Sequence, residues 1–217
     1  MTTKEITEGL MKIRVPAVCD VLDKEFGLWN QILDKDIRPL QLNMKIAGPA
    51  FTMFGMKSRE TNKKKRLIVR AVDEMPAGSV VVMSTGGDED TGHWGELLSN
   101  AAVCHGVNGA VLDGGIRDSG AILELGFPVF HRYFAPGDST GRFNIVGYEV
   151  PVVVGGVRIH PGDFVFGDCD GIVVIPKEIA EPVLQMASNI HTTEDEIRDR
   201  IRRGEKVTDL FFEYGQL

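Results

Sequence analysis

The sequence predicts an α/β fold, and three observations carry that prediction. Residues 79–134 follow the order strand, loop, helix, strand, turn, helix, strand, which is the pattern of an α/β core. Residues 79–84 form a β-branched block of the kind that is buried inside a sheet. Residues 144–175 hold short Val, Ile and Phe runs separated by Gly, Pro and Asp, which predicts hairpins and a second sheet.

The composition is typical of a folded domain. The chain has 217 residues, 43% hydrophobic and 25% charged, and these values exclude a disordered tail or a collagen-like repeat. We expect residues 1–217 to form a single domain. The net charge of −7 argues against nucleic acid as a partner, because phosphate binding draws on an excess of Lys and Arg. No uncharged apolar run reaches the roughly 20 residues that cross a bilayer, so no membrane partner is expected.

The N-terminus and the cysteines predict a cytoplasmic location. Residues 1–10 lack the basic flank and the apolar block of a secretory signal. Cys19, Cys104 and Cys169 are odd in number and form no C-x-x-C pair, so neither a disulfide framework nor a zinc knuckle is expected. Their apolar neighbours indicate small core residues with reduced thiols.

The N-terminal third is predicted to hold helices, a strand and a further helix. Residues 4–26 form one or two helices, and Pro16 marks either a break or the first turn of the second. A strand is expected over residues 47–56 and a helix over 61–74. The latter opens with the basic run Lys63-Lys64-Lys65-Arg66. Because no aromatic residue interleaves this run, a solvated helix face is favoured over a phosphate or partner site.

The remaining elements follow from periodicity and turn residues. The strand at 79–84 precedes a Gly- and Asp-rich loop at 85–95 and a helix at 96–104. Then come a strand at 109–112, a tight turn at 113–118, a helix at 119–125 and a strand at 127–134. Ser119 is a candidate N-cap and Gly126 a helix stop. The last helix spans residues 177–203, and its later part alternates acids and bases, so it is exposed or lies on another subunit.

The first candidate site is the helix start at Gly95-Glu96-Leu97-Leu98. Unpaired N–H groups and a partial positive charge let the first turn of a helix hold a small carboxylate or phosphate. Gly95 permits close approach of a ligand to the backbone. Glu96 is either a surface acid that favours the helix dipole, which is the commoner case, or a member of a metal shell.

The second candidate site is Arg117 and Asp118, after two glycines that follow a buried strand. Ligands of α/β sheets collect at the carboxyl ends of strands. A mutual ion pair, or an Asp that caps the next helix, would explain both residues structurally. Equally, Arg117 could grip a carboxylate through its planar fork while Asp118 binds a hard cation.

Other polar residues carry weaker signals. His93 could act as a base or ligand at the mouth of a site, but an ordinary loop histidine is favoured. The acids at residues 88–90 are expected to solvate the loop. Asp168 and Asp170 stand between two strands, where a turn explains them better than catalysis does.

Four motifs follow one another along the chain: Gly95-Glu96-Leu97-Leu98, D-G-G-I-R-D at 113–118, G-F-P-V-F at 126–130 and G-D-C-D-G-I-V-V-I-P at 167–176. In this order and spacing they resemble the 4-hydroxy-4-methyl-2-oxoglutarate aldolase family. That family also contains the regulator of ribonuclease activity A. The resemblance covers about residues 18–196.

The resemblance implies a swivelling α/β/β fold with a core sheet, a hairpin-rich second sheet and a C-terminal helix, assembled as homotrimers or homohexamers. It implies a metal-dependent, Schiff-base-free lyase that cleaves a 4-hydroxy-2-oxo acid and releases pyruvate. By match to the motifs, Asp118 would bind the metal directly and Arg117 the substrate. The backbone of residues 95–98 would hold the pyruvyl carboxylate. Glu96, where members often carry Asp, would act on the metal through water, as would Glu194 or Glu196 of a neighbouring subunit.

The residue types agree with this chemistry. Cleavage leaves a pyruvate enolate, which a divalent cation and Arg117 can stabilise. The expected ligands are oxygens, which favours Mg²⁺ or Mn²⁺ over zinc. Oxaloacetate decarboxylation passes through the same enolate, so one site could serve both reactions. Two alternatives stay open: a non-enzymatic regulator that binds and inhibits a ribonuclease, and a related sugar-acid lyase.

Overall fold

The computed structural model describes residues 1–62 and 66–215. Its helices are α1 Thr3–Leu10, α2 Val15–Phe26, α3 Leu67–Asp73, α4 Glu96–Cys104, α5 Ser119–Leu125, α6 Ala180–Arg202 and α7 Val207–Tyr214, and a 3₁₀ turn at Lys177–Ile179 precedes α6. Its strands are β1 Arg38–Pro39, β2 Ile46–Lys57, β3 Val80–Ser84, β4 Gly92–Trp94, β5 Gly109–Leu112, β6 Gly115–Ile116, β7 Val129–His131, β8 Tyr133–Phe134, β9 Phe143–Tyr148, β10 Val152–Val154, β11 Val157–Ile159, β12 Phe164–Gly167 and β13 Ile172–Ile175.

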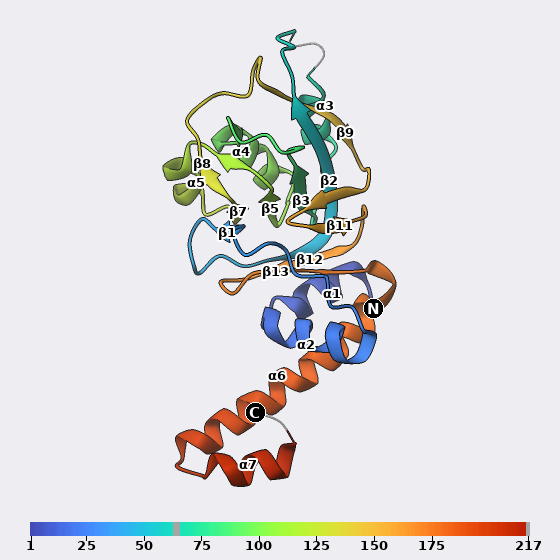
Figure 1. Cartoon of the computed structure of the whole chain (residues 1–217), viewed down its shortest axis with the longest axis vertical. Coiled ribbons are helices and arrows are strands. Elements are labelled where there is room, and N and C mark those ends of the chain that lie inside the picture. Colours follow the sequence, from blue (N-terminus) through green and yellow to red (C-terminus); the bar gives the residue numbers. More distant parts are fainter. Residues whose placement is uncertain (63–65, 216–217) are drawn as a thin grey trace.

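The centre of the molecule is an eight-stranded sheet (Figure 1). Its order is β1-β7-β5-β3-β2-β12-β13, and β9 pairs with β2 off this path. The strands β2, β3, β5 and β7 are parallel to one another. The strands β1, β9 and β12 join them in antiparallel pairs, and β13 is antiparallel to β12.

A smaller sheet lies beyond the carboxyl ends of the parallel strands. It consists of β4, β6 and β8, which pair parallel to one another. These three strands follow β3, β5 and β7 along the chain, so the small sheet repeats the order of the core strands. Ligand sites of α/β proteins form at this edge of a sheet.

Both faces of the core sheet are buried, as the unbroken apolar runs of its strands require. In β3, Val81 and Met83 pack on the side of α3, α4 and α5, with Trp94 and Ile122. The alternate residues Val80 and Val82 pack on the other side, where the β10–β11 hairpin covers the sheet. A third apolar cluster joins α1, α2 and the first half of α6 to β12 and β13.

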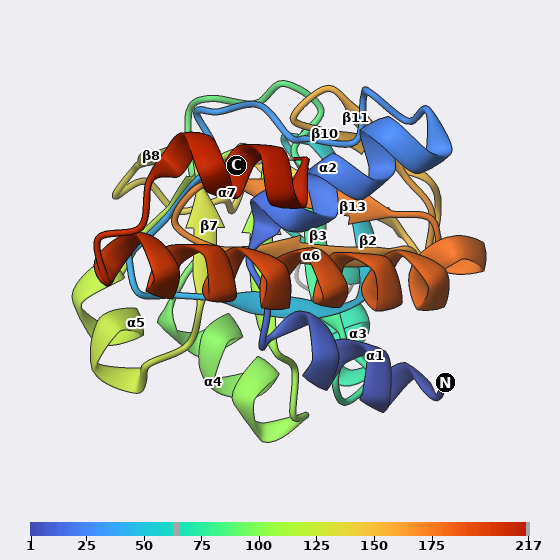
Figure 2. The same cartoon turned by 90° about the horizontal axis from the view of Figure 1, so that it is seen from below.

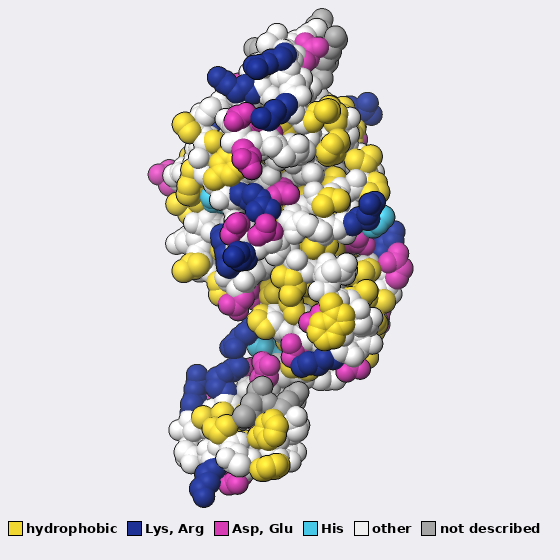
Figure 3. Space-filling view, viewed as in Figure 1, with side chains coloured by type: hydrophobic (Ala, Val, Ile, Leu, Met, Phe, Trp, Pro, Cys, Tyr) yellow, Lys and Arg dark blue, Asp and Glu magenta, His cyan; other side chains and the backbone are white. Residues whose placement is uncertain are grey.

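The C-terminal helices extend away from the sheets. Figures 1 and 3 show the second half of α6 leaving the main body, and Figure 2 shows α7 folded back beside α6. Arg200 of α6 holds this hairpin together, since its Nη1 donates to Glu213 at 2.7 Å and its Nε to Glu205 at 2.8 Å. Phe212 of α7 is 79% exposed. No described helix combines the length and the apolar character that a membrane crossing requires.

The structure confirms the α/β class and many predicted elements. The strand at 109–112 and the helices at 96–104 and 119–125 have the predicted bounds, and Pro16 does lie in the first turn of a second N-terminal helix. Gly126 ends α5 with φ of 71°. Ser119 is not the N-cap of α5, because that position belongs to Asp118.

Several expectations about the elements were wrong. The helix expected from residue 61 begins at Leu67, and Lys63, Lys64 and Lys65 of the basic run lie outside the described residues. The loop at 85–95 and the turn at 113–118 contain β4 and β6, and the strand expected at 127–134 is divided between β7 and β8 of different sheets. The β12–β13 hairpin extends the core sheet rather than a second one, and α7 was not predicted.

The cysteines also differ from expectation. Cys104 and Cys169 are exposed, not core residues, because each stands at the end or turn of an element rather than inside it. Cys19 is partly buried on α2, and burial raises the pKa of its thiol to about 12.

Candidate active site

A pocket of about 410 Å³ opens where the small sheet meets the start of α4. Five chain segments contribute to it, and the lining residues are 66, 68, 69, 92–98, 117, 118, 138, 139 and 143–145. The two candidate segments from the sequence, at residues 95–98 and at Arg117 and Asp118, thus line one pocket. They meet because β4 and β6 are neighbours in the small sheet.

Asp118 holds an unusual backbone conformation at the start of α5. Its φ of 57° and ψ of 31° are left-handed, and among the described non-glycine residues only Glu149 shares a positive φ. Its side chain makes no capping hydrogen bond and is 45% exposed. Capping therefore does not explain this residue. Backbone strain of this kind collects at functional sites. The carboxylate does form the mutual ion pair with Arg117 that the sequence offered as a structural explanation, at 3.5 Å, and its remaining exposed surface is available to a ligand.

Arg117 is held beside this carboxylate. Its backbone N–H donates to the Trp94 carbonyl at 2.9 Å, which ties β6 to β4. Its Nε lies 3.5 Å from Asp118 Oδ2, and its Nη1 lies 3.4 Å from Asp138 Oδ1. Hydrogen bonds from Thr140, with a smaller contribution from the Arg117 charge, lower the pKa of Asp138 and keep it ionised.

The start of α4 presents backbone N–H groups to the same pocket. Gly95 is the N-cap, and no side chain caps the first turn. Glu96 turns along the helix instead, where its Oε1 accepts a hydrogen bond from Asn100 Nδ2 at 3.1 Å. A small anion bound here would meet both these N–H groups and the guanidinium of Arg117.

His93 lines the pocket from a strand rather than from a loop, and both of its ring nitrogens form hydrogen bonds. It lies in β4 with its ring buried, its Nδ1 accepts from Gly115 N–H at 3.1 Å, and its Nε2 donates to Asp88 Oδ2 at 2.9 Å. Burial lowers the pKa of this imidazole, although the Asp88 carboxylate opposes the effect. Asp88 is correspondingly 1% exposed, which contradicts its expected role in loop solvation. His93 thus links β4 to β6 through Gly115, and Asp88 holds the His93 ring in place.

Arg66 also lines the pocket, although its sequence pattern did not indicate a site residue. It was assigned with its run to a solvated helix face, but it precedes α3 and lines the pocket. Its guanidinium donates to Ser139 Oγ at 2.8 Å and to Thr140 Oγ1 at 2.9 Å. No pattern around Arg66 distinguishes it from its lysine neighbours, so only the folded chain identifies it.

Three carboxylates of the described residues line this pocket: Glu96 is bonded to Asn100, Asp138 to Thr140 and Arg117, and Asp118 makes no capping bond. Among the described residues, the one group with three or more metal-donor atoms within 4.8 Å of each other is Asp168, Cys169 and Asp170, away from the pocket. Mg²⁺ and Mn²⁺ commonly take one or two carboxylates and complete their shell with substrate oxygens and water. Asp118, whose carboxylate is partly exposed and makes no capping hydrogen bond, is suited to be such a ligand.

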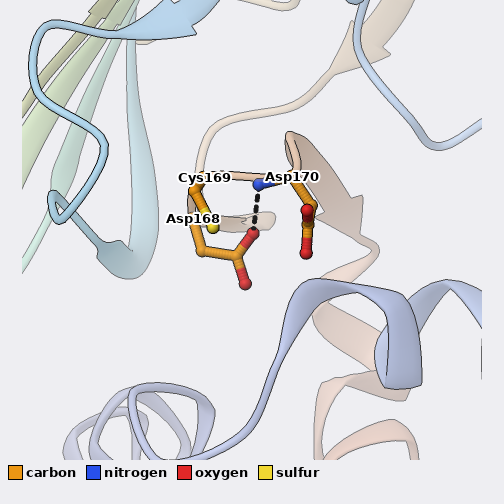
Figure 4. Close-up of side chains that lie close together, drawn as sticks. All are labelled: Asp168, Cys169 and Asp170. Carbon is orange, nitrogen blue, oxygen red and sulfur yellow. Dashed lines mark hydrogen bonds between the residues drawn. The ribbon is translucent and has the colours of Figure 1, made fainter.

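The acidic group at residues 168–170 has a structural explanation (Figure 4). Asp168 Oδ1 accepts from the Asp170 N–H at 2.9 Å, and its Oδ2 accepts from the Val15 N–H at 3.0 Å. The first bond closes the turn between β12 and β13, and the second satisfies the first turn of α2. The prediction that these residues form a turn is confirmed.

Glu194 and Glu196 do not reach the pocket of their own chain. Both belong to the second half of α6, which projects from the main body, and neither lines the pocket. They can approach such a site only on another copy of the chain, so their role stays a prediction.

The chain is similar to several known proteins. A protein of Halalkalibacterium halodurans provisionally named 4-hydroxy-4-methyl-2-oxoglutarate aldolase is 37% identical, over 86% of this chain and 84% of its own. Protein DlpA of Legionella pneumophila is 28% identical over 98% of this chain, which spans about a third of DlpA's length. The crystal structure of Streptomyces coelicolor RraAS2, described as an unusual member of the RNase ES inhibitor RraA family, superimposes with a TM-score of 0.80 at 31% identity, covering 89% of this chain and 96% of that one.

A family model decides the classification. The RraA-like model, described as Aldolase/RraA, matches residues 15–174 and so includes the pocket strands and α5. The family resemblance of the four sequence motifs is confirmed. The chain belongs to the RraA-like (Aldolase/RraA) family.

Proposed function

We propose that this protein is a divalent-metal-dependent lyase that cleaves a 4-hydroxy-2-oxo acid and releases pyruvate. One observation carries the proposal. The Asp118 carboxylate makes no capping hydrogen bond, lies 3.5 Å from the Arg117 guanidinium, and lines a pocket that the first turn of α4 also lines. The name of the Halalkalibacterium relative supports the same reaction class.

Arg117 would bind the substrate carboxylate. A guanidinium presents parallel N–H donors that match two carboxylate oxygens, and Asp138 together with the Trp94 carbonyl fixes where Arg117 lies. Its positive charge then stands beside the oxygens on which negative charge develops during cleavage, without any need to reorganise.

The first turn of α4 would orient the same end of the substrate. Its N–H groups at residues 96–98 have no side-chain cap, and Gly95 leaves the backbone accessible. Two sets of donors on one small anion hold the 2-oxo group in a single orientation, which raises the effective concentration of the reacting groups.

Asp118 would hold the divalent cation, Mg²⁺ or Mn²⁺, because its carboxylate lies 3.5 Å from Arg117 and makes no capping bond, whereas the Asp138 carboxylate, 3.4 Å from Arg117, also accepts from the Thr140 N–H. A bound divalent cation supplies Lewis-acid stabilisation of the charge that develops as the carbon–carbon bond breaks. Glu96 lines the pocket and would act on the cation through water. Glu194 or Glu196 of a neighbouring copy would do the same in a homotrimer or homohexamer.

Release of pyruvate tests the proposal. A coupled assay with 4-hydroxy-4-methyl-2-oxoglutarate and with oxaloacetate should show turnover with Mg²⁺ or Mn²⁺ and none with a chelator. Asp118→Asn should abolish turnover, and Glu124→Gln, which changes an exposed acid of the same helix outside the pocket, should not. Absence of turnover with every divalent ion would contradict the proposal.

A second candidate function is regulation of a ribonuclease, because the similar RraAS2 structure is described as belonging to an RNase inhibitor family. The two functions make opposite predictions for Asp118→Asn. A regulator should inhibit an RNase E-type nuclease on a reporter RNA equally well with and without this substitution, and should release no pyruvate.

A further inference from the structure

The pocket contains a second guanidinium, that of Arg66, with which no acid of residues 1–62 and 66–215 forms an ion pair. Among the described residues, the partners of the Arg66 side chain are the neutral hydroxyls of Ser139 and Thr140. A guanidinium has about five N–H donors, so two such bonds leave others to offer. A positive charge that lines a pocket with only neutral partners is suited to bind an anionic group.

One turn places both arginines on the pocket. Asp138 pairs with Arg117, and the next two residues, Ser139 and Thr140, accept from Arg66. The Thr140 N–H donates to Asp138 Oδ2 at 3.2 Å, which closes the turn on itself. The two guanidinium groups are therefore fixed relative to each other, as two anchors for one ligand would need to be.

The segment beside this turn offers a further polar group. Asn144 lines the pocket, and within the described part of the chain its buried Oδ1 has no hydrogen-bond partner. A buried acceptor without a donor is costly, and among the groups of a 4-hydroxy-2-oxo acid the hydroxyl is the donor that would satisfy it. Its neighbours Phe143 and Ile145 are buried and apolar, so they can contact the carbon chain of a ligand.

We infer that Arg66 binds the second anionic group of the substrate, at the end distal to its 2-oxo acid, and that this one residue sets the preference for an acid with a second carboxylate over one without it. This inference rests on the proposed function for the placement of the 2-oxo acid at Arg117. A site built to pair with a carboxylate rejects an analogue that lacks it, because the charged donor is then left without a partner. Arg66 therefore sets specificity, whereas Arg117 serves every 2-oxo acid.

Two five-carbon acids test the inference by binding alone. 2-Oxoglutarate and 2-oxopentanoate differ only in a terminal carboxylate or methyl group, and neither carries the hydroxyl that cleavage requires. Calorimetric titration in Mg²⁺ should show 2-oxoglutarate binding about tenfold or more tighter to the wild-type protein. Arg66→Gln should remove that preference by weakening 2-oxoglutarate alone, and Arg66→Lys should keep part of it.

Matched variants separate recognition from structure. Arg70→Gln removes an exposed arginine of α3 that pairs with Glu74, outside the pocket, and should leave both affinities unchanged. Asn144→Asp places a negative charge on the same wall, so it should weaken 2-oxoglutarate and spare 2-oxopentanoate even if Arg66→Gln fails to fold.

The outcomes divide cleanly. A wild-type protein that binds the two acids equally, or binds neither, overturns the inference. Equal loss of both ligands in Arg66→Gln also overturns it, because that result indicates that Arg66 only supports the turn at 138–140. The pyruvate assay is separate: preferential binding of 2-oxoglutarate without cleavage of any hydroxy acid would contradict the proposed lyase and leave the diacid site standing.

Discussion

A methyl group on the Cα of Gly95 would lie 2.7 Å from Oδ2 of Asp118. Gly95 occupies the N-cap position of α4 and Asp118 that of α5, although neither makes a capping hydrogen bond, so the two helices begin against each other. The Asp118 carboxylate therefore lies at the start of α4, and the Arg117 side chain lies next to this carboxylate and to Gly95. The backbone conformation does not require glycine at this position, because the Gly95 φ of −154° is accessible to any residue. Glycine is required because a side chain would occupy the space of the Asp118 carboxylate.

Gly95→Ala should therefore inactivate the protein without unfolding it. The added methyl meets the end of a side chain, so the carboxylate rotates away while the backbone stays in place. We expect pyruvate release to fall by about 100-fold or more, since a displacement of about 1 Å can cost this much. Gly120→Ala is the control, because nothing lies within 4 Å of its added methyl. A Gly95→Ala protein that is folded and fully active would contradict this placement of the carboxylate.

Arg117→Lys should lower turnover by well over about tenfold. Lysine keeps the charge but replaces the planar fork with a single ammonium group, and it cannot reproduce two parallel hydrogen bonds to a carboxylate. Steady-state pyruvate release, with circular dichroism to verify folding, provides the measurement. Near-normal kcat/KM would remove Arg117 from substrate binding.

His93 should make stability depend on pH. Burial lowers its pKa below the usual 6.5, so the folded state binds fewer protons than the unfolded chain. The stability that the neutral His93 contributes to the folded state is fully present above pH 6.5. It is lost as the pH falls toward the pKa of His93 in the folded state. His131, whose pKa burial also lowers, acts in the same direction.

Urea unfolding at about pH 7.5 and about pH 5 measures this effect. The free energy of unfolding should fall toward the lower pH in the wild-type protein, and the fall should be smaller in His93→Gln, which cannot titrate there. An equal pH dependence in both proteins would mean that His93 is not a buried neutral imidazole.

Asp168→Ala should destabilise the fold without affecting activity. It removes an acceptor from the first turn of α2 and another from the β12–β13 turn, and loss of such a cap costs about 1 kcal/mol. Asp170→Ala is the matched control, because Asp170 contributes only its backbone N–H to the turn. A loss of metal-dependent turnover in Asp168→Ala would instead show that this cluster binds the ion.

The sequence was informative wherever local patterns decide the structure. The strand at residues 109–112 and the helix that Gly126 ends depend on apolar periodicity and on a left-handed stop, both of which are local. The candidate segments around Gly95 and Asp118 were found from glycines and charges placed after buried strands. Their meeting in one pocket agrees with the rule that such loops share an edge of the sheet.

The missed features depend on contacts between distant segments. β4 and β6 are too short to show a period and exist because each pairs with the other. Asp88 and His93 resemble loop residues in the sequence, but the fold buries both, with His93 bonded to Gly115 and to Asp88. Arg66 is placed in the pocket by Ser139 and Thr140, more than 70 residues away along the chain. No local pattern carries that information.

The most direct measurement is the anomalous scattering of crystals soaked with Mn²⁺ and pyruvate. We predict a manganese peak within coordination distance of Asp118, about 2.2 Å from a carboxylate oxygen, with the pyruvate carboxylate between Arg117 and the first turn of α4. Manganese bound elsewhere, for example at Asp168 and Asp170, with the Asp118 carboxylate turned away from the pyruvate, would contradict it.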